Sequence, residues 1–162
     1  MDSDRRIHIS ISQQTLTALE QDEVVKSYSI SSALNGIGQQ SGSGCTPLGG
    51  HYIRAKIGSG AAPNSVFVGR RFTGEIYSDE LAAQYPNRDW ILSRIMWLSG
   101  KEKGFNRMGK VDSMARYIYI HGTPDSEPMG VAKSHGCIRM RNNEVIELFD
   151  WAPDFCPVLI EE

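Results

Sequence analysis

The residues best suited to chemistry are a cysteine and two histidines close together in the chain. Cys137 ends the run Ser134-His135-Gly136-Cys137 and follows His121 by sixteen residues. A cysteine acts as a nucleophile only as its thiolate, and an ordinary thiol pKa of about 8.5 means that an imidazole must take the proton near neutral pH. The spacing therefore predicts covalent catalysis by Cys137 with a histidine as general base.

Either histidine could be that base. His135 lies two residues from Cys137, and in an extended chain such a pair points to one side but is often held apart by the pleat. His121 ends an apolar run, and the residues that follow include proline and glycine, which allow the chain to fold back and bring Cys137 beside it. We expect His121 to be the base, with its second ring nitrogen oriented by the Gly122 carbonyl.

Two neighbours of Cys137 fit the same reaction. Attack on an amide carbonyl creates an oxyanion, and Gly136 would let consecutive backbone N–H groups converge on that oxygen. A helix beginning just past Cys137 would add its positive end to both thiolate and oxyanion. Arg139 is placed to bind a substrate carboxylate in two-pronged fashion, which would select an acidic peptide.

Each of these residues also has a plainer interpretation. Cys137 could be a buried structural thiol, and His121 a strand-end histidine bonded to backbone. A zinc site from His121, His135 and Cys137 is conceivable, because all three are zinc ligands, but a fourth ligand at ordinary spacing is missing. We therefore expect no metal and no cofactor. Cys45 and Cys156 are expected to be small hydrophobes without a chemical role.

Length and charge limit the class of protein. The chain of 162 residues suits a single domain, 1–162, and its net charge of −2, with no long basic run, argues against binding nucleic acid. No window holds the roughly 18 to 20 apolar residues that cross a bilayer, so we expect no membrane span. The N-terminal residues lack the apolar centre of a secretory signal, which predicts a cytoplasmic protein, or a periplasmic one if a signal peptide was removed.

Hydrophobic periodicity predicts a mostly β fold with about eight strands and one or two short helices. The expected strands are 7–11, 15–19, 24–31, 52–57, 65–68, 90–98, 117–120 and 158–160. A short helix is expected over 78–84, and a second one capped by Asn142 or Asn143 and ending before Pro153. The apolar face of the second helix comprises Val145, Ile146, Leu148 and Phe149.

Two irregular stretches separate these elements. The stretch 35–50 contains six glycines and is expected to be a loop that brings backbone close to something. The stretch 101–116 contains five Lys or Arg against two acids. A solvated loop is its simplest interpretation, and a mobile flap that attracts acidic peptides over the cleft is the functional alternative.

The pattern around Cys137 resembles a known family. His121-Gly122-Thr123, followed by Ser-His-Gly-Cys-Ile-Arg-Met at 134–140, resembles the active-site signature of the L,D-transpeptidase catalytic domain, the YkuD-like family. Thr46-Pro47-Leu48-Gly49 is similar to the Thr-Pro-x-Gly turn of that family, and the likeness extends from about Ile7 to Ile160. The resemblance implies a β-sandwich-like L,D-transpeptidase catalytic domain.

The same resemblance implies a cysteine acyltransferase that acts on a peptidoglycan stem peptide or muropeptide. Cys137 would attack the L,D bond between diaminopimelate and D-alanine of a stem tetrapeptide, leaving a thioester acyl-enzyme. Carried over by motif, His121 would be the general base and the Gly122 carbonyl its orienting group. His135, Gly136 and Cys137 would shape the oxyanion hole.

The resemblance leaves the acceptor open. Arg139 would contact a stem-peptide carboxylate, whichever acceptor is used. Transfer to an amine would make the protein an L,D-transpeptidase, and transfer to water an L,D-carboxypeptidase, which a cytoplasmic location and muropeptide recycling would favour. A carbapenem is expected to be a covalent inhibitor. The alternative function is a non-catalytic wall-peptide or metal-binding module on the same fold.

Overall fold

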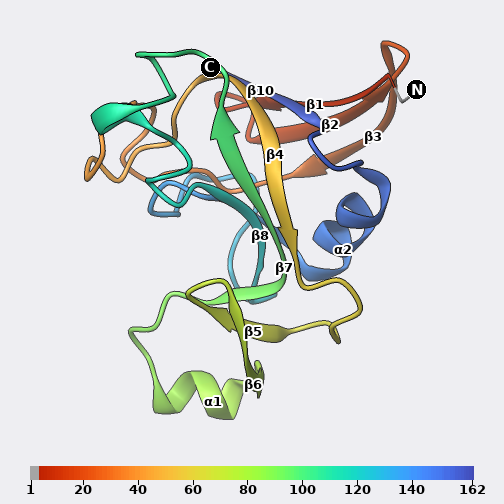
Figure 1. The fold of residues 1–162 in the computed structure, drawn as a ribbon. Helices are drawn as coiled ribbons and strands as arrows, with labels where there is room; N and C mark the ends of the chain where they lie inside the picture. The colour runs from red at the N-terminus through yellow and green to blue at the C-terminus, as the bar shows by residue number, and fades with distance from the viewer. Residues whose placement is uncertain (1–3) are drawn as a thin grey trace.

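The computed structural model describes residues 4–162, which form one curled sheet of ten strands and two α-helices (Figure 1). The strands are β1 Arg5–Ser10, β2 Thr15–Glu20, β3 Glu23–Ser29, β4 Gly49–Ile57, β5 Ser65–Val68, β6 Arg71–Ile76, β7 Ile91–Gly100, β8 Tyr119–Thr123, β9 Ile138–Arg141 and β10 Pro157–Glu161. The helices are α1 Asp79–Gln84, α2 Asn142–Trp151 and a short 3₁₀ helix, Gly109–Val111. The signal-peptide prediction partly concerns residues 1–3, which lie outside the described residues.

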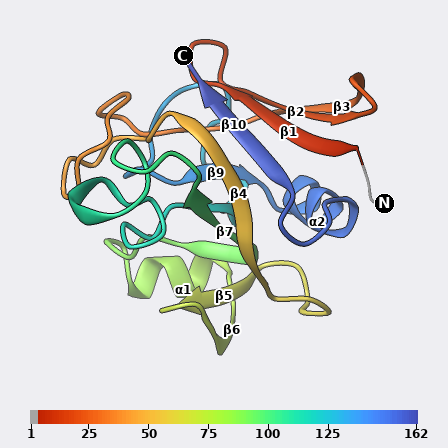
Figure 2. The ribbon, with the colours of Figure 1, turned by 45° about the horizontal axis from the view of Figure 1, so that its top comes forward.

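The sheet follows the order β3-β2-β1-β10-β4-β7-β5-β6. β8 pairs with β7 in antiparallel fashion and with β9 in parallel. Figures 1 and 2 place β1, β2 and β3 at one end of the molecule and β5, β6 and α1 at the other. The long strand β7 connects the two ends, because it pairs with β4, β5 and β8.

The largest of three apolar clusters packs inside the curled sheet. Ile7 and Ile9 of β1 alternate inward and are at most 1% exposed, as the alternating sequence predicts. They belong to the same buried cluster as Ile120 of β8 and Ile138 of β9. The buried face of α2, with Val145, Leu148 and Phe149, completes this cluster as predicted. Since β8 and β9 are anchored in it, their opposite face is held rigidly.

The mostly β class with short helices is confirmed, and two strands were not predicted. β6 has exposed and polar residues over most of its length, so it gives no clear alternation. β9 begins at Ile138, where a helix just past Cys137 was considered, so that helix is wrong. Pairing with β8 decides the conformation there, because Ile138 and Met140 reach the core only from a strand.

The predicted cap of α2 is also wrong, because Arg141 occupies the cap position and makes no side-chain capping bond. The Asn142 side chain is instead buried and links three elements. Its amide donates to the carbonyl of Thr123 at 2.9 Å, and its oxygen accepts from Ser93 Oγ at 2.6 Å. Asn142 therefore links α2 to the end of β8 and does not cap the N-terminus of its own helix.

The basic stretch 101–116 is tied down beside β4. The buried Asn106 side chain donates to the carbonyls of Leu48 and Gly50 at 3.0 and 2.9 Å. The buried Ser113 hydroxyl contacts His51 Nε2 at 2.7 Å. None of the described residues 101–116 lines the cavity that contains Cys137, so the flap interpretation is not retained.

Candidate active site

The parallel pair β8–β9 brings the predicted chemical residues to one face of the sheet. His121 lies opposite Arg139 in the register, and Cys137 directly precedes β9, beside Tyr119. Because side chains alternate along a strand, these four residues point to the same side. The alternate residues point into the core: Ile118, Ile120, Ile138 and Met140.

That face opens onto a cavity of about 290 Å³. Four residues singled out from the sequence line it, namely His121, His135, Cys137 and Arg139. The sequence did not show whether His121 and Cys137 lie close together. The pairing of β9 with β8 brings both residues to one cavity. Gly122 and Gly136, the two predicted glycines, lie behind this wall.

The His121 imidazole is held in one orientation. Its Nδ1 donates to the Gly122 carbonyl at 2.7 Å, the contact expected from the sequence. Because a carbonyl can only accept, Nδ1 carries the proton, and Nε2 keeps its lone pair in the neutral ring. Burial lowers the pKa of His121, which is 1% exposed. His121 is therefore neutral at pH 7 and able to accept a proton at Nε2.

Gly122 can hold that imidazole only as a glycine. A side-chain Cβ would lie 2.5 Å from Asn142 Oδ1 and 2.6 Å from the Leu92 carbonyl oxygen. The strand therefore passes too close to its neighbours for any larger residue.

The Cys137 thiol is protonated at rest. Burial raises its pKa to about 12, and this outweighs the N–H of Tyr119, which donates to Sγ at 3.3 Å and acts in the opposite direction. The S–H donates to the carbonyl of Tyr117, also at 3.3 Å. To act as a nucleophile, Cys137 would need a base to remove this proton, and the neutral His121 lines the same cavity.

The turn before Cys137 is built around Gly136, whose φ of +132° is a conformation that favours glycine. A Cβ there would also lie 3.2 Å from the Cys45 carbonyl oxygen, in the glycine-rich stretch 35–50. Thr46 Oγ1 donates to the Gly136 carbonyl at 2.9 Å. The stretch 35–50 was expected to bring its backbone close to another part of the chain. It lies against the turn that carries Cys137.

Ser134 fixes the same turn from inside. Its hydroxyl donates to the Cys137 carbonyl at 2.6 Å and accepts the Gly136 N–H at 3.2 Å. Since that N–H is engaged, the N–H groups of His135 and Cys137 are the better candidates to receive an oxyanion. The expectation that Gly136 lets neighbouring N–H groups converge on an oxyanion stays a prediction, and its positive φ is the conformation such a turn needs.

Asp89 joins the remaining charged residues of the cavity. Its carboxylate lies 3.8 Å from His135 Nδ1 and 3.3 Å from an Arg139 guanidinium nitrogen. Arg139 also pairs with Glu127 at 3.1 Å, and only 9% of its side chain is exposed. A substrate carboxylate at Arg139 would have to compete with two carboxylates already in place. The His135 side chain is largely exposed, in keeping with a positioning role.

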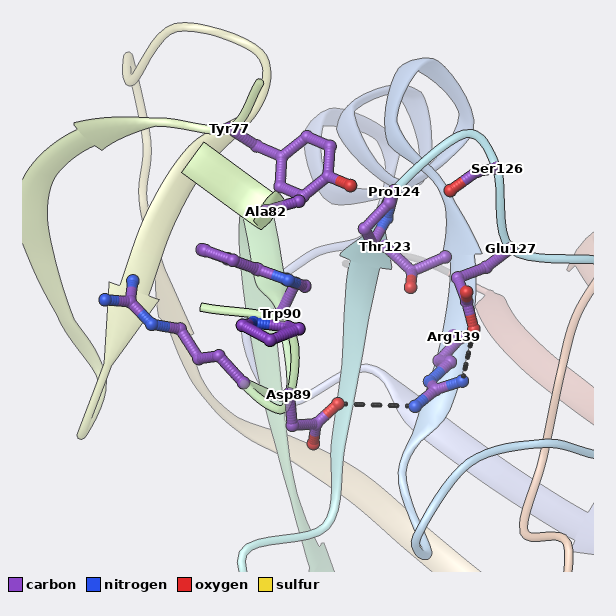
Figure 3. Close-up of a pocket in the computed structure, with 11 residues that line it drawn as sticks. Tyr77, Ala82, Asp89, Trp90, Thr123, Pro124, Ser126, Glu127 and Arg139 are labelled. Atoms are coloured by element: carbon purple, nitrogen blue, oxygen red, sulfur yellow. Dashed lines mark hydrogen bonds and ion pairs between the residues drawn. The ribbon is translucent and has the colours of Figure 1, made fainter. Parts of the chain in front are cut away.

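Arg139 separates the catalytic cavity from a second one of about 240 Å³ (Figure 3). Figure 3 shows its guanidinium between Asp89 and Glu127, with the rings of Tyr77 and Trp90 on the facing wall. Asp89 and Arg139 line both cavities, so the two spaces adjoin at this ion pair.

The sequence did not single out Asp89, Tyr119 or Arg70, which also line the cavity. Asp89 and Arg70 come from loops far from Cys137 in the chain, and only the position of Tyr119 in a β run next to His121 gave a usable signal.

The described part of the chain contains neither a metal cluster nor a helix that could span a membrane. Among residues 4–162, no group of three or more His, Cys, Asp or Glu side chains is arranged to hold a metal ion. Within that range, no helix is long and apolar enough to cross a bilayer.

Comparison with known proteins places this geometry in a family. The model of the L,D-transpeptidase catalytic domain, YkuD, matches residues 4–160. The chain belongs to the L,D-transpeptidase catalytic-domain family. It is 42% identical over 59 residues to YqjB of Bacillus subtilis (strain 168), a protein provisionally named an L,D-transpeptidase; the match covers 36% of this chain and 32% of that one.

Solved L,D-transpeptidase structures share the fold. The L,D-transpeptidase (residues 123-326) from Xylanimonas cellulosilytica superposes with a TM-score of 0.56 at 20% identity, over 99% of this chain and 62% of that chain. LD transpeptidase LdtMt1, solved in complex with imipenem, gives a TM-score of 0.57 at 18% identity, over 98% of this chain and 59% of that one. The L,D-transpeptidase domain described here thus spans about a third of its curated relative and about six-tenths of these solved chains.

Proposed function

We propose that this protein is a cysteine acyltransferase that cleaves the L,D bond between diaminopimelate and terminal D-alanine in peptidoglycan stem tetrapeptides. One observation carries the proposal: Cys137 and the neutral, oriented His121 face a common cavity from two paired strands. Family membership supplies the substrate class.

The first half-reaction needs one proton transfer and one attack. His121 Nε2 takes the Cys137 proton, and the thiolate adds to the scissile carbonyl carbon to give a tetrahedral oxyanion. Collapse of the oxyanion breaks the C–N bond, and the imidazolium returns its proton to the departing amine of D-alanine. The products are free D-alanine and a Cys137 thioester.

The oxyanion forms next to the turn that carries Cys137. We assign its stabilisation to the backbone N–H groups of Cys137 and His135, because the Gly136 N–H is bound to Ser134. Ser134 and Thr46 hold the carbonyls of this turn, which supports donors fixed in advance rather than ordered during the reaction.

The second half-reaction reverses these roles. His121 takes a proton from an amine or from water, the acceptor attacks the thioester carbonyl, and the thiolate of Cys137 leaves and regains its proton. An amine acceptor gives L,D-transpeptidation, whereas water gives L,D-carboxypeptidation and a tripeptide.

The test is covalent labelling followed by product analysis. A carbapenem should add its full mass to the protein, and peptide mapping should locate the adduct on Cys137 rather than on Cys45 or Cys156. Cys137→Ala should abolish both this adduct and the release of D-alanine from a tetrapeptide. Product masses with and without an added amine then distinguish transpeptidation from carboxypeptidation.

The competing function is a wall-peptide-binding module without catalysis. It predicts that wild-type protein binds the tetrapeptide but gives no adduct and no D-alanine, and that Cys137→Ala binds as the wild type does. That pair of results would refute the enzymatic proposal.

A further inference from the structure

A second arginine reaches the catalytic cavity from the tip of the β5–β6 hairpin. Val68 and Arg71 are paired, so Gly69 and Arg70 form a two-residue turn. Both have positive φ, +56° and +66°, as a type I′ turn requires. Such turns favour Gly, Asn or Asp, and an arginine there is held in an uncommon, strained backbone conformation.

The Arg70 side chain is fixed in place by three aromatic residues. Its guanidinium donates to Tyr119 Oη at 3.1 Å, and its central carbon lies 4.9 Å from the ring centroids of both Trp97 and Tyr117. Stacking on two rings orients the planar group without using its N–H donors. Within residues 4–162, Tyr119 Oη is the hydrogen-bond acceptor found for this guanidinium, which leaves donors for a ligand.

Two arginines among residues 4–162 line this cavity, and Arg70 is the one that forms no ion pair with a carboxylate. Among residues 4–162, no Asp or Glu forms an ion pair with it, whereas Arg139 pairs with both Asp89 and Glu127. Arg70 and Arg116 are both half-buried, but Arg116 does not line this cavity and donates to backbone carbonyls such as that of Cys45. Of the two arginines among residues 4–162 that line this cavity, Arg70 is therefore the one that offers an incoming anion an unpaired guanidinium.

Tyr119 lies between this guanidinium and the Cys137 thiol and contacts both. Its backbone N–H touches Cys137 Sγ at one end, and its hydroxyl touches Arg70 at the other. Tyr119 therefore contacts both the thiol and the cation, and both line the same cavity. The carboxylate of a terminal amino acid lies three bonds beyond the scissile carbonyl, so a donor whose carbonyl is at Cys137 has its carboxylate nearby.

We propose that Arg70 binds a carboxylate of the acyl donor close to the scissile bond, and so selects substrates that carry one. This inference rests on the proposed function for the identity of the donor. It assigns to Arg70 the carboxylate contact that the sequence alone suggested for Arg139. In a stem tetrapeptide two groups have this chemistry: the C-terminal carboxylate of D-alanine and the side-chain carboxylate of diaminopimelate.

The test measures binding in a Cys137→Ala background, so that it does not depend on turnover. Calorimetry would compare a stem tetrapeptide with two analogues, one amidated at its C-terminus and one amidated at the diaminopimelate side chain. With Arg70 intact, one of the amidated peptides should bind about ten- to a hundredfold more weakly, as expected for a lost charge-assisted pair. The peptide that loses affinity identifies the carboxylate.

Arg70→Gln should remove this discrimination, so that all three peptides bind alike. Arg71→Gln is the matched control, because Arg71 is adjacent and exposed but does not line the cavity, and it should preserve the discrimination. Equal discrimination in the Arg70→Gln and Arg71→Gln proteins would overturn the inference. So would undetectable tetrapeptide binding with Arg70 intact.

The two proposals fail in different ways. If protein with Cys137 neither reacts with a carbapenem nor releases D-alanine, the acyltransferase proposal fails while the binding preference can still be measured. If it releases D-alanine and Arg70→Gln leaves KM unchanged for every peptide, only the role of Arg70 is wrong.

Discussion

At the scale of single residues, the resting cysteine is a thiol rather than half of a thiolate–imidazolium pair. Burial raises the pKa of Cys137 to about 12 and lowers that of His121, so both effects favour the neutral pair. A substrate carbonyl that receives the negative charge removes this penalty. Under the proposed mechanism, the thiolate of Cys137 would therefore form only when it has a carbonyl to attack.

This predicts an unusual pH dependence for alkylation of Cys137. For an ordinary thiol with a pKa of about 8.5 the rate levels off by a pH of about 10, because the thiolate is then almost fully formed. For Cys137 it should continue to rise towards a pH of about 12. Rates with iodoacetamide, followed for each cysteine peptide by mass spectrometry, measure this directly. A plateau for the Cys137 peptide below pH 9 would show a preformed thiolate.

Gly122→Ala should damage both stability and catalysis. The added methyl would lie 2.6 Å from the Leu92 carbonyl oxygen, and relief of this overlap must shift β8 and with it the carbonyl that orients His121. We expect a loss of about 1–3 kcal/mol in the free energy of unfolding, measured by urea titration. D-alanine release should fall more than tenfold at temperatures where the variant is folded.

Gly50→Ala is the matched control for this substitution. Gly50 is also a strand glycine, but its added Cβ would have no heavy atom closer than 3.6 Å, an ordinary contact. Similar losses in both variants would mean that strand glycines matter here for reasons unrelated to His121.

At the scale of elements, one buried polar side chain links α2 to the ends of β7 and β8, in addition to the apolar packing of the helix. Asn142 bonds to Thr123 at the end of β8 and to Ser93 in β7, and it is 5% exposed. Asn142→Ala should cost about 2–3 kcal/mol, because buried partners lose their hydrogen bonds. Asn143→Ala, at an exposed position of the same helix, should cost less than about 0.5 kcal/mol. Chemical denaturation of both variants checks the difference.

Elements with a clear hydrophobic period were predictable from the sequence. Ile7 and Ile9 gave β1 by alternation, and Val145, Leu148 and Phe149 gave the buried face of α2. β9 was missed because its four residues follow the glycine turn directly and gain their conformation from β8. Local sequence does not contain that pairing.

The site was predictable where its residues are close in sequence and not where the fold assembles them. The run ending at Cys137, together with His121, was apparent from residue types and spacing. Asp89 and Arg70 reach the cavity from a loop and a hairpin tip that the sheet brings to it. The sequence favoured Asn142 as a helix cap. Its side chain is instead buried near the ends of two strands, where it forms hydrogen bonds with Ser93 and Thr123.

At the scale of the whole molecule, a second buried histidine joins the sheet to the long connection that precedes β8. His51 of β4 is fully buried, with Nδ1 against the Gly49 carbonyl at 3.0 Å and Nε2 against Ser113 Oγ at 2.7 Å. Both residues lie outside the catalytic cavity. The pair therefore acts on global stability, by fixing 101–116 to β4, rather than on the reaction.

Burial lowers the pKa of His51 from 6.5 to about 4, and this makes stability depend on pH. Above pH 6.5 neither the folded nor the unfolded state protonates this residue. Between 6.5 and 4 the unfolded chain binds a proton that the folded protein excludes, so stability is lost as the pH falls through this window. The total contribution is about 3 kcal/mol.

The prediction can be separated from general acid effects with two variants. Wild-type protein should lose about 3 kcal/mol through His51 between about pH 7 and pH 4, and His51→Gln should lose correspondingly less although it starts less stable. Ser113→Ala should be less stable at every pH but keep the wild-type slope, because burial of His51, the main cause of its lowered pKa, remains. Urea titrations across this range give both quantities. Parallel curves for wild type and His51→Gln would mean that His51 is protonated equally in both states, and that the acid sensitivity of the fold lies with other groups.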